Sequence, residues 1–190
     1  MPTTTTPSQS EALRILEDEH EQVRELVERL GSDDFVRSAT IGGGDWSAKD
    51  LLGHLTSWEE HALEALAAWR RGEPGPIQRA LRIQGLNGVN ADAVAADRER
   101  SADTICTRFD DIHRRLVAEI RSLPQATWDA PPTTRSRRSL GHVVGGIVGG
   151  PAGPFTHASA HLPHLRAYVE SVRGPGPAAP ATPETPAHGG

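Results

Sequence analysis

Three histidines in two distant segments are the residues of this chain best suited to chemistry. His54 ends the stretch Trp46-Ser-Ala-Lys-Asp-Leu-Leu-Gly-His54, and a later stretch reads His157-Ala-Ser-Ala-His161-Leu-Pro-His164. Residues four apart in a helix leave the same face, so His157 and His161 are close enough to share one ion. A third imidazole from another helix would complete a metal site with positions open for water or substrate.

Two more histidines lie at the end of the second segment and in the stretch before it. His164 follows His161 by three residues, and Pro163 stands between them. Because Pro163 disturbs the helix, we expect His164 to hydrogen-bond a metal ligand or face solvent rather than bind the ion. His142 lies in a glycine-rich stretch, and a loop of this kind can approach the mouth of a helical bundle. Both are therefore candidates for the surroundings of the site.

The segment after His54 supplies two further candidates. Trp58 and His61 follow His54 by four and seven residues, so they share its helical stripe. We expect Trp58 to pack in the core or at its rim, where it is also a candidate for lining the pocket, and His61 to face solvent. Cys106 lies beside an apolar stripe, which indicates a buried, inert thiol. The remaining histidines for which no role is expected are His20, His113 and His188.

Four segments with apolar residues at helical spacing must position these groups. The first covers 11–30 and stops at Gly31, and the second starts at Ser47, which forms a capping-box pattern with Asp50. The third covers about 90–123, and the fourth starts near Pro154 and continues to about 169 with Pro163 inside it. No segment has a convincing strand pattern. The sequence therefore predicts an all-α four-helix bundle with functional groups between facing helices.

The ends of the chain differ from its middle in composition. Residues 1–10 are mostly Thr, Ser and Pro, and residues 174–190 are mostly Pro, Ala, Gly and Thr. Such segments contain too little apolar surface to pack a core, so we expect disordered tails at both ends. The bundle itself is expected to span 11–173 as a single domain.

Composition narrows the classes of partner and compartment. The chain has 190 residues, a formal net charge of -5 and 36% hydrophobic residues. Its basic residues cluster only at Arg135, Arg137 and Arg138, so we expect no nucleic-acid partner. No apolar run is long enough for a membrane span or a signal peptide, so we expect no membrane partner. A single cysteine permits no intrachain disulfide, which favours the cytoplasm.

The two motifs together resemble those of a known superfamily. Trp46-Ser47-x-Lys-Asp50-Leu-Leu-x-His54-Leu, followed much later by His157-x-x-x-His161-Leu-Pro, is similar to the DinB-like four-helix-bundle superfamily. That superfamily includes the N-terminal domain of mycothiol-dependent maleylpyruvate isomerase. The resemblance implies that His54, His157 and His161 are metal ligands, although relatives can carry Glu at the position of His157. It is also compatible with a homodimer.

The resemblance implies a class of reaction as well. Three neutral imidazoles leave a divalent ion its full charge, which lowers the pKa of a bound water or thiol. Zinc suits such ligands best, and nickel and iron also accept them. The resemblance implies a transferase that joins a low-molecular-weight thiol, mycothiol, to a small electrophile. Two alternatives stay open: a metal-water hydrolase or self-resistance protein that opens a reactive natural product, and a non-catalytic, stress-induced metal- or ligand-binding bundle.

Overall fold

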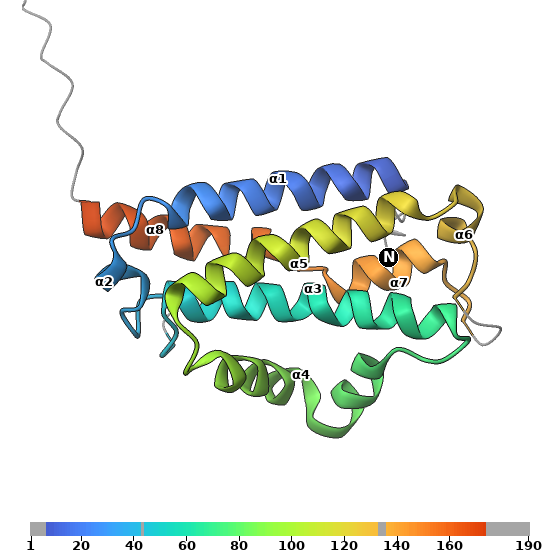
Figure 1. Ribbon diagram of the computed structural model, residues 1–190, viewed down its shortest axis with the longest axis horizontal. Coiled ribbons are helices and arrows are strands. Elements are labelled where there is room, and N and C mark those ends of the chain that lie inside the picture. The colour runs from blue at the N-terminus through green and yellow to red at the C-terminus, as the bar shows by residue number, and fades with distance from the viewer. Residues whose placement is uncertain (1–6, 43, 133–135, 174–190) are drawn as a thin grey trace, which may run out of the picture.

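The computed structural model describes residues 7–42, 44–132 and 136–173. Within these ranges the chain forms eight α-helices, one short 3-10 helix and no strand beyond an isolated bridge between Gly150 and Gly153 (Figure 1). The predicted all-α fold is therefore confirmed. Residues 1–6 and 174–190, for which tails were predicted, lie outside the described part of the chain, and the first helix begins at Gln9, inside the predicted 1–10 tail.

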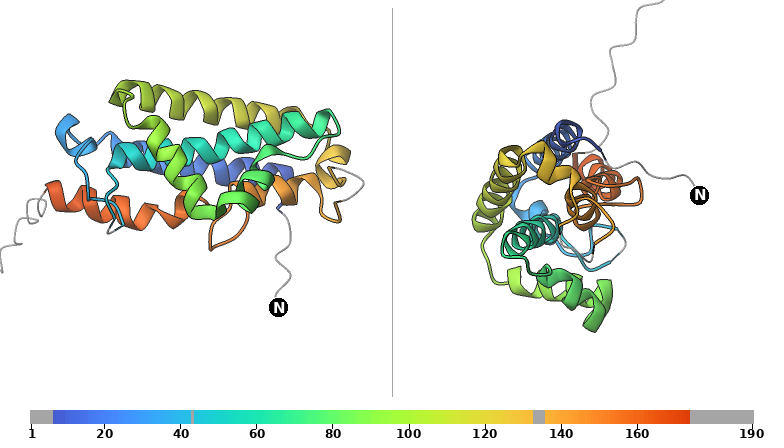
Figure 2. Two further views of the ribbon diagram at one scale, coloured as in Figure 1. Left: turned by 90° about the horizontal axis from the view of Figure 1, so that it is seen from below. Right: turned by 90° about the vertical axis from the view of Figure 1, so that its right-hand side faces the viewer.

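Three long helices and one interrupted helix form the bundle. The fourth position is shared by α7 and α8, which lie end to end with a break between them, while α4 packs outside the bundle against α3 (Figures 1 and 2). The short helices α2 and α6 lie at opposite ends (Figure 1). The elements are α1 (Gln9–Val27), α2 (Ser32–Phe35), α3 (Ala48–Arg70), α4 (Pro76–Asp97), α5 (Ala102–Ser122), α6 (Gln125–Asp129), α7 (Leu140–Ile147), a 3-10 helix η1 (Ala158–Ala160) and α8 (Leu162–Arg173).

Side-chain caps define where the helices begin. The predicted capping box at the start of α3 is present: the Asp50 backbone N–H donates to Ser47 Oγ over 3.1 Å, and the Ser47 N–H donates to Asp50 Oδ2 over 2.9 Å. This cap holds the first turn of the helix that carries His54. Ser8 caps α1, and Ser101 caps α5 in the same way through the backbone N–H of Thr104.

The single helix predicted over 90–123 was wrong. The chain instead completes α4 at Asp97, turns, and restarts as α5 at Ala102. Lys49 on α3 donates to the carbonyls of Arg98 and Arg100 over 2.9 and 2.8 Å, so the linking backbone finds partners outside a helix. Together with the Ser101 cap, these contacts make the break favourable.

The helix predicted from Pro154 was also wrong. Phe155 has a positive φ of 65°, a conformation that an L-residue adopts only at a turn, and the regular helix begins only at Leu162. Pro163 is therefore in the first turn of α8, where its missing N–H costs no helical hydrogen bond, and it does not bend a longer helix. The histidine pair therefore flanks the short 3-10 helix η1 and does not lie within a regular α-helix.

A polar layer divides the apolar core into two halves. One apolar cluster includes Leu16, Leu116 and Trp128, toward the α6 end, and the other includes Val23, Phe35 and Phe109, toward the α2 end. Between them along α1, α3 and α5 lie buried or mostly buried polar residues: Glu19, His20, His54, Glu59 and His113. The break between α7 and α8 lies at the level of this layer, since His157 contacts the ring of His54.

No helix in the described ranges combines the length and the apolar character that crossing a bilayer requires.

Candidate metal centre

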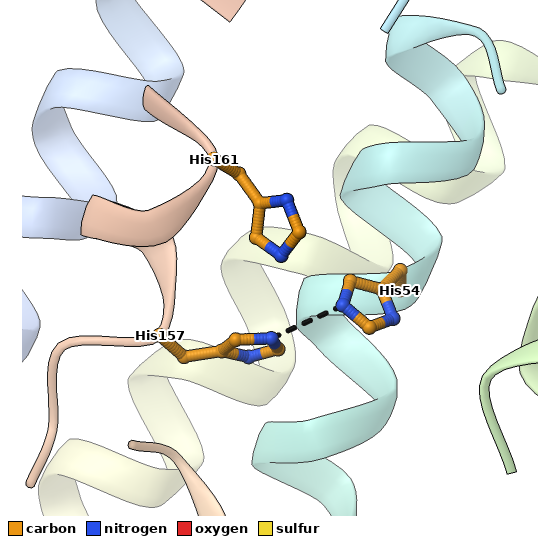
Figure 3. A group of neighbouring side chains, drawn as sticks. All are labelled: His54, His157 and His161. Carbon is orange, nitrogen blue, oxygen red and sulfur yellow. Dashed lines mark hydrogen bonds between the residues drawn. The ribbon is translucent and has the colours of Figure 1, made fainter. Parts of the chain in front are cut away.

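The three predicted histidines meet at the polar layer (Figure 3). His54 projects from the middle of α3 and is only 2% exposed, whereas His157 and His161 flank η1 and are half-buried. One potential ligand nitrogen from each ring lies within 4.8 Å of the others. The group thus combines one rigid helical residue with two residues of a turn, and part of the turn's surface stays accessible.

The distance between two of the rings suits an ion bound between them. His54 Nε2 and His157 Nε2 are 3.1 Å apart, and nitrogens around a tetrahedral zinc with bonds of about 2.0–2.1 Å are separated by about 3.3 Å. The other nitrogen of His54, Nδ1, is buried with no hydrogen-bond partner among the described residues. The polar contact described for the His54 ring is therefore to another imidazole nitrogen, an arrangement that a shared cation satisfies.

Burial keeps these imidazoles neutral. Desolvation, followed by the nearby His157 and His161, lowers the pKa of His54 to about 2. Desolvation and His161 lower the pKa of His157 to about 3, and desolvation and His164 lower the pKa of His161. At neutral pH each ring therefore has a free lone pair, which metal binding requires.

A buried carboxylate holds the turn that carries the histidine pair. Glu19 on α1 is 7% exposed, and its Oε2 accepts the backbone N–H of Ser159 over 3.1 Å while its Oε1 accepts the Ser159 hydroxyl. Burial raises the pKa of Glu19, and these hydrogen bonds partly oppose that effect. On the other side of the turn, the His157 N–H donates to the carbonyl of Val148 over 3.2 Å. These contacts determine where His157 and His161 lie.

Close backbone packing leads into the same turn. A Cβ on Gly150 would come within 2.4 Å of the carbonyl oxygen of Thr156, and one on Gly145 would come within 2.5 Å of the Phe155 ring. Only glycine permits these approaches. The glycine-rich stretch thus packs closely and supports His157. Part of this stretch forms helix α7, which was not predicted.

Two tryptophans border the histidines. The Trp46 ring centroid is 4.8 Å from that of His54, and the Trp58 centroid is 5.8 Å from that of His157. Trp58 Nε1 donates to Asn90 Oδ1 of α4 over 3.1 Å, which orients the indole. Trp58 therefore lies next to the three histidines.

The other candidates lie outside the trio. His61 packs edge-on against Trp58 and is 3.4 Å from Glu64 Oε2, and His164 lines an open groove with Asp34 and Tyr168. His142 lies half-buried on α7. Cys106 is half-buried, and burial raises its pKa, which agrees with an unreactive thiol.

Sequence reasoning missed two carboxylates of the polar layer. Glu19 continues the spacing of buried positions 12, 16, 23 and 26 on α1, and Glu59 continues that of 52, 55, 62 and 66 on α3. Two acids on apolar stripes at spacings of three and four indicate buried charges, which proteins rarely keep without a partner. That signal was available in the sequence.

The chain is similar to one known protein family and to two solved structures. The family model described as the mycothiol maleylpyruvate isomerase N-terminal domain matches residues 16–147. A crystal structure of an uncharacterised protein from Escherichia coli UTI89 has a TM-score of 0.74 and 14% identity, covering 88% of this chain and 96% of that one. The colibactin self-resistance protein ClbS, in complex with a dsDNA, has a TM-score of 0.69 and 14% identity, covering 86% and 95%. No curated protein matches the chain.

The comparison with ClbS corrects one expectation. Charge composition led us to expect no nucleic-acid partner, but a protein of the same fold has been crystallised with a dsDNA. The exclusion was therefore wrong, because a sparse basic surface does not rule out nucleic acid for this fold.

The family match covers α3 with His54 and stops at residue 147, before His157 and His161. The geometry of the trio is thus an observation independent of that match. Because the match spans more than half of the chain, the protein belongs to the mycothiol maleylpyruvate isomerase N-terminal domain family, within the DinB-like bundles.

Proposed function

We propose that this protein is a metal-dependent transferase that joins a low-molecular-weight thiol, mycothiol, to a small electrophile. His54, His157 and His161 would hold a divalent ion, with zinc favoured by the all-imidazole donor set over nickel and iron. When bound, the ion supplies Lewis acidity that favours the thiolate over the thiol at neutral pH. A cytoplasmic location fits a reduced thiol cosubstrate.

One observation carries this proposal: three neutral imidazoles bring a nitrogen each to one place in the polar layer, beside a turn whose surface is partly accessible. Each residue has a defined task. His54 provides the fixed ligand on α3, Glu19 holds the turn that presents the other two, and Trp46 and Trp58 pack beside the rings of His54 and His157. The family match supports mycothiol as the thiol.

Turnover of a generic electrophile tests the proposal. The zinc-loaded protein is mixed with monochlorobimane and mycothiol, and the fluorescent conjugate is followed against a thiol-only control. We expect conjugation in the wild type, background rates in His54→Ala, and near-wild-type rates in His61→Ala, which leaves the trio intact. Metal-loaded protein that gives the background rate with a panel of electrophiles and with both mycothiol and bacillithiol would argue against a thiol transferase.

A second candidate is a self-resistance protein that opens a reactive ring with water. The structural likeness to the colibactin self-resistance protein ClbS favours it, since that protein shares the fold over most of both chains. The same three histidines would serve, with water in place of the thiol. Turnover of a strained-ring substrate, such as an aryl cyclopropane or epoxide, without any thiol separates this candidate from the first.

The third alternative, a bundle that binds metal without turnover, has its own outcome. Stoichiometric metal in the purified protein, together with no thiol-dependent and no thiol-independent turnover, would favour it over both enzymes. The metal analysis thus separates a failed substrate choice from a failed metal site.

A further inference from the structure

A small cavity lies behind His157, on the side of α1 and α5. Its volume is about 30 Å³, and its walls include His157, Ala158, His20 and Glu59, with Phe109 and Phe155 among the apolar residues. A buried water needs about 10–15 Å³ of such space. The cavity therefore has room for at least one water.

Two polar atoms of its lining residues have no described partner. Glu59 Oε2 and His20 Nδ1 are both buried, and neither has a hydrogen-bond partner in the described ranges. The opposite atom of each group is engaged, because Glu59 Oε1 lies 3.0 Å from His113 Nδ1 and His20 Nε2 lies 3.0 Å from Asp110 Oδ1. Buried polar atoms of this kind are usually satisfied by ordered water.

Neighbouring rings hold His20 in place. Its centroid lies 4.2 Å from that of Phe109 and 3.8 Å from that of His113, with the rings nearly parallel in both pairs. The ring therefore cannot turn without losing both stacks. With the Nε2 proton donated to Asp110, Nδ1 of the neutral His20 ring is an acceptor for a donor in the cavity.

His157, which also lines the cavity, has a second ring nitrogen that can bind a water. Its Nε2 faces His54 across 3.1 Å, so Nδ1 is the ring nitrogen left for a partner outside the trio. Histidines that bind metals usually donate this second N–H to a carboxylate, a carbonyl or a water, which fixes the ring and makes the ligand more basic.

We propose that the cavity is a water-binding site, in which one ordered water accepts from His157 Nδ1 and donates to Glu59 Oε2 and to His20 Nδ1. Glu59 is then a positioning residue that acts on His157 through the water. The hydrogen bonds balance, because the water uses both protons and one lone pair. The role toward His157 rests on the metal site proposed above, whereas the water site itself does not.

The first arm of the test looks for the water in the metal-free, full-length protein. Water–protein NOE spectra should show cross peaks from a long-lived water to the carbon-bound ring protons of His20 and His157. Leu16→Phe, which fills the cavity from its α1 wall, should remove these peaks, and Leu16→Met should keep them. Absence of the peaks from the wild-type protein would overturn the water site.

The second arm measures metal affinity by chelator competition with zinc and cobalt. Glu59→Gln keeps the oxygen that faces His113 but replaces the acceptor Oε2 with a donor, so we expect a 10–100-fold weaker affinity and a shifted cobalt absorption spectrum. Glu64→Gln is the matched control, because Glu64 lies on the same helix with a side chain 56% exposed. It should stay within about twofold of wild type, as surface substitutions away from a site generally do.

The outcomes separate the two proposals. Unchanged affinity and an unchanged cobalt spectrum in Glu59→Gln would overturn the role of Glu59 while leaving the trio intact. A wild-type protein that shows the water but binds neither metal would overturn the metal site and leave the water site standing. If Glu59→Gln does not fold, the zinc affinities of Leu16→Phe and Leu16→Met replace it: a weaker affinity in Leu16→Phe alone supports the role of the water, and equal affinities overturn it.

Discussion

Two histidine clusters share the polar layer, and they are built in opposite ways. In the trio, the rings of His54, His157 and His161 meet edge to face at 73–80°, with nitrogens turned toward one another. In the second cluster, His20 and His113 stack 3.8 Å apart at 14°, and their nitrogens face the carboxylates of Asp110 and Glu59. The two clusters therefore differ in the direction of their ring nitrogens and, within the described ranges, in whether a carboxylate faces those nitrogens.

The difference follows from the elements that carry the rings. His20 and His113 project from two regular helices, α1 and α5, whose packed faces bring the rings flat against each other. His157 and His161 flank the short 3-10 helix η1, which lies in the gap between α7 and α8, and both of their rings reach His54. The break in the fourth helix thus creates the convergent cluster.

The largest expected effect is loss of the metal from one cluster and not from the other. His54→Ala should purify with less than about a tenth of the wild-type zinc, because two imidazoles of a turn do not hold the ion alone. His113→Asn should keep full stoichiometry at saturating zinc, since His113 faces Glu59 and not the trio. Mass spectrometry measures the zinc content of both variants. Equal zinc in the two would contradict the assignment of the metal to the trio and not to the second cluster.

Removing the carboxylate that holds the turn should come next. Glu19→Ala leaves the Ser159 N–H and hydroxyl without their acceptor, which should lower the free energy of unfolding by about 1–3 kcal/mol. The affinity for zinc should also fall. Glu19→Gln should lose less stability and less zinc affinity than Glu19→Ala. Urea denaturation and chelator competition give the two values. The exposed Glu21→Ala serves as control and should change stability by no more than about 0.5 kcal/mol.

A pair of adjacent glycines tests the support of the turn. A Cβ on Gly145 would meet Phe155 and Pro154 at 2.5 and 2.7 Å, so Gly145→Ala should cost about 1–3 kcal/mol of stability and weaken metal binding. Gly146→Ala meets no atom within 4 Å and should be neutral or slightly stabilising. Equal thermal denaturation curves for the two variants would show that the glycine-rich segment does not support the site.

The smallest effect is a pH dependence near neutrality. Burial and the nearby His113 lower the pKa of His20 to about 4, from 6.5, so below pH 6.5 the unfolded chain binds more protons than the folded one. The stability due to neutral His20 is complete above pH 6.5 and is lost as the pH falls toward about 4. Between pH 7.5 and pH 6, the free energy of unfolding of metal-free His20→Gln should therefore fall by about 1 kcal/mol less than that of the metal-free wild type. Urea denaturation of wild type and His20→Gln at both pH values measures this difference. Equal losses of stability in the two proteins would contradict the prediction.

The sequence predicted the regular parts of the molecule better than the turn that matters most. The capping residues and apolar spacing identified α1 and α3 to within a few residues, and with α3 they placed His54 correctly. The trio itself was named from its spacing and its resemblance to a superfamily, although the helix assumed for His157 and His161 is absent. Two residues that are four apart stay close in a 3-10 turn as well, so the three histidines do lie together although the predicted local structure was wrong.

What the sequence could not reveal depends on contacts between distant residues. The positive φ of Phe155 and the close approach of Gly150 to Thr156 belong to a tightly packed loop, whose shape the propensities of its single residues do not encode. The hydrogen bonds from Ser159 to Glu19 join positions 140 residues apart. Glu19 and Glu59 were nonetheless detectable as acids on apolar stripes.

The break between α7 and α8 has a consequence for how the chain stays folded. An ion shared by His54 and His157 would cross-link positions 103 residues apart and close the gap in the fourth helix. A ligand that binds only the folded form stabilises it by about 2.7 kcal/mol at a hundredfold excess over its Kd. The C-terminal helix α8, which begins directly after His161, would then be anchored in proportion to the free metal concentration. Metal supply would set the lifetime of the folded protein as well as its chemistry.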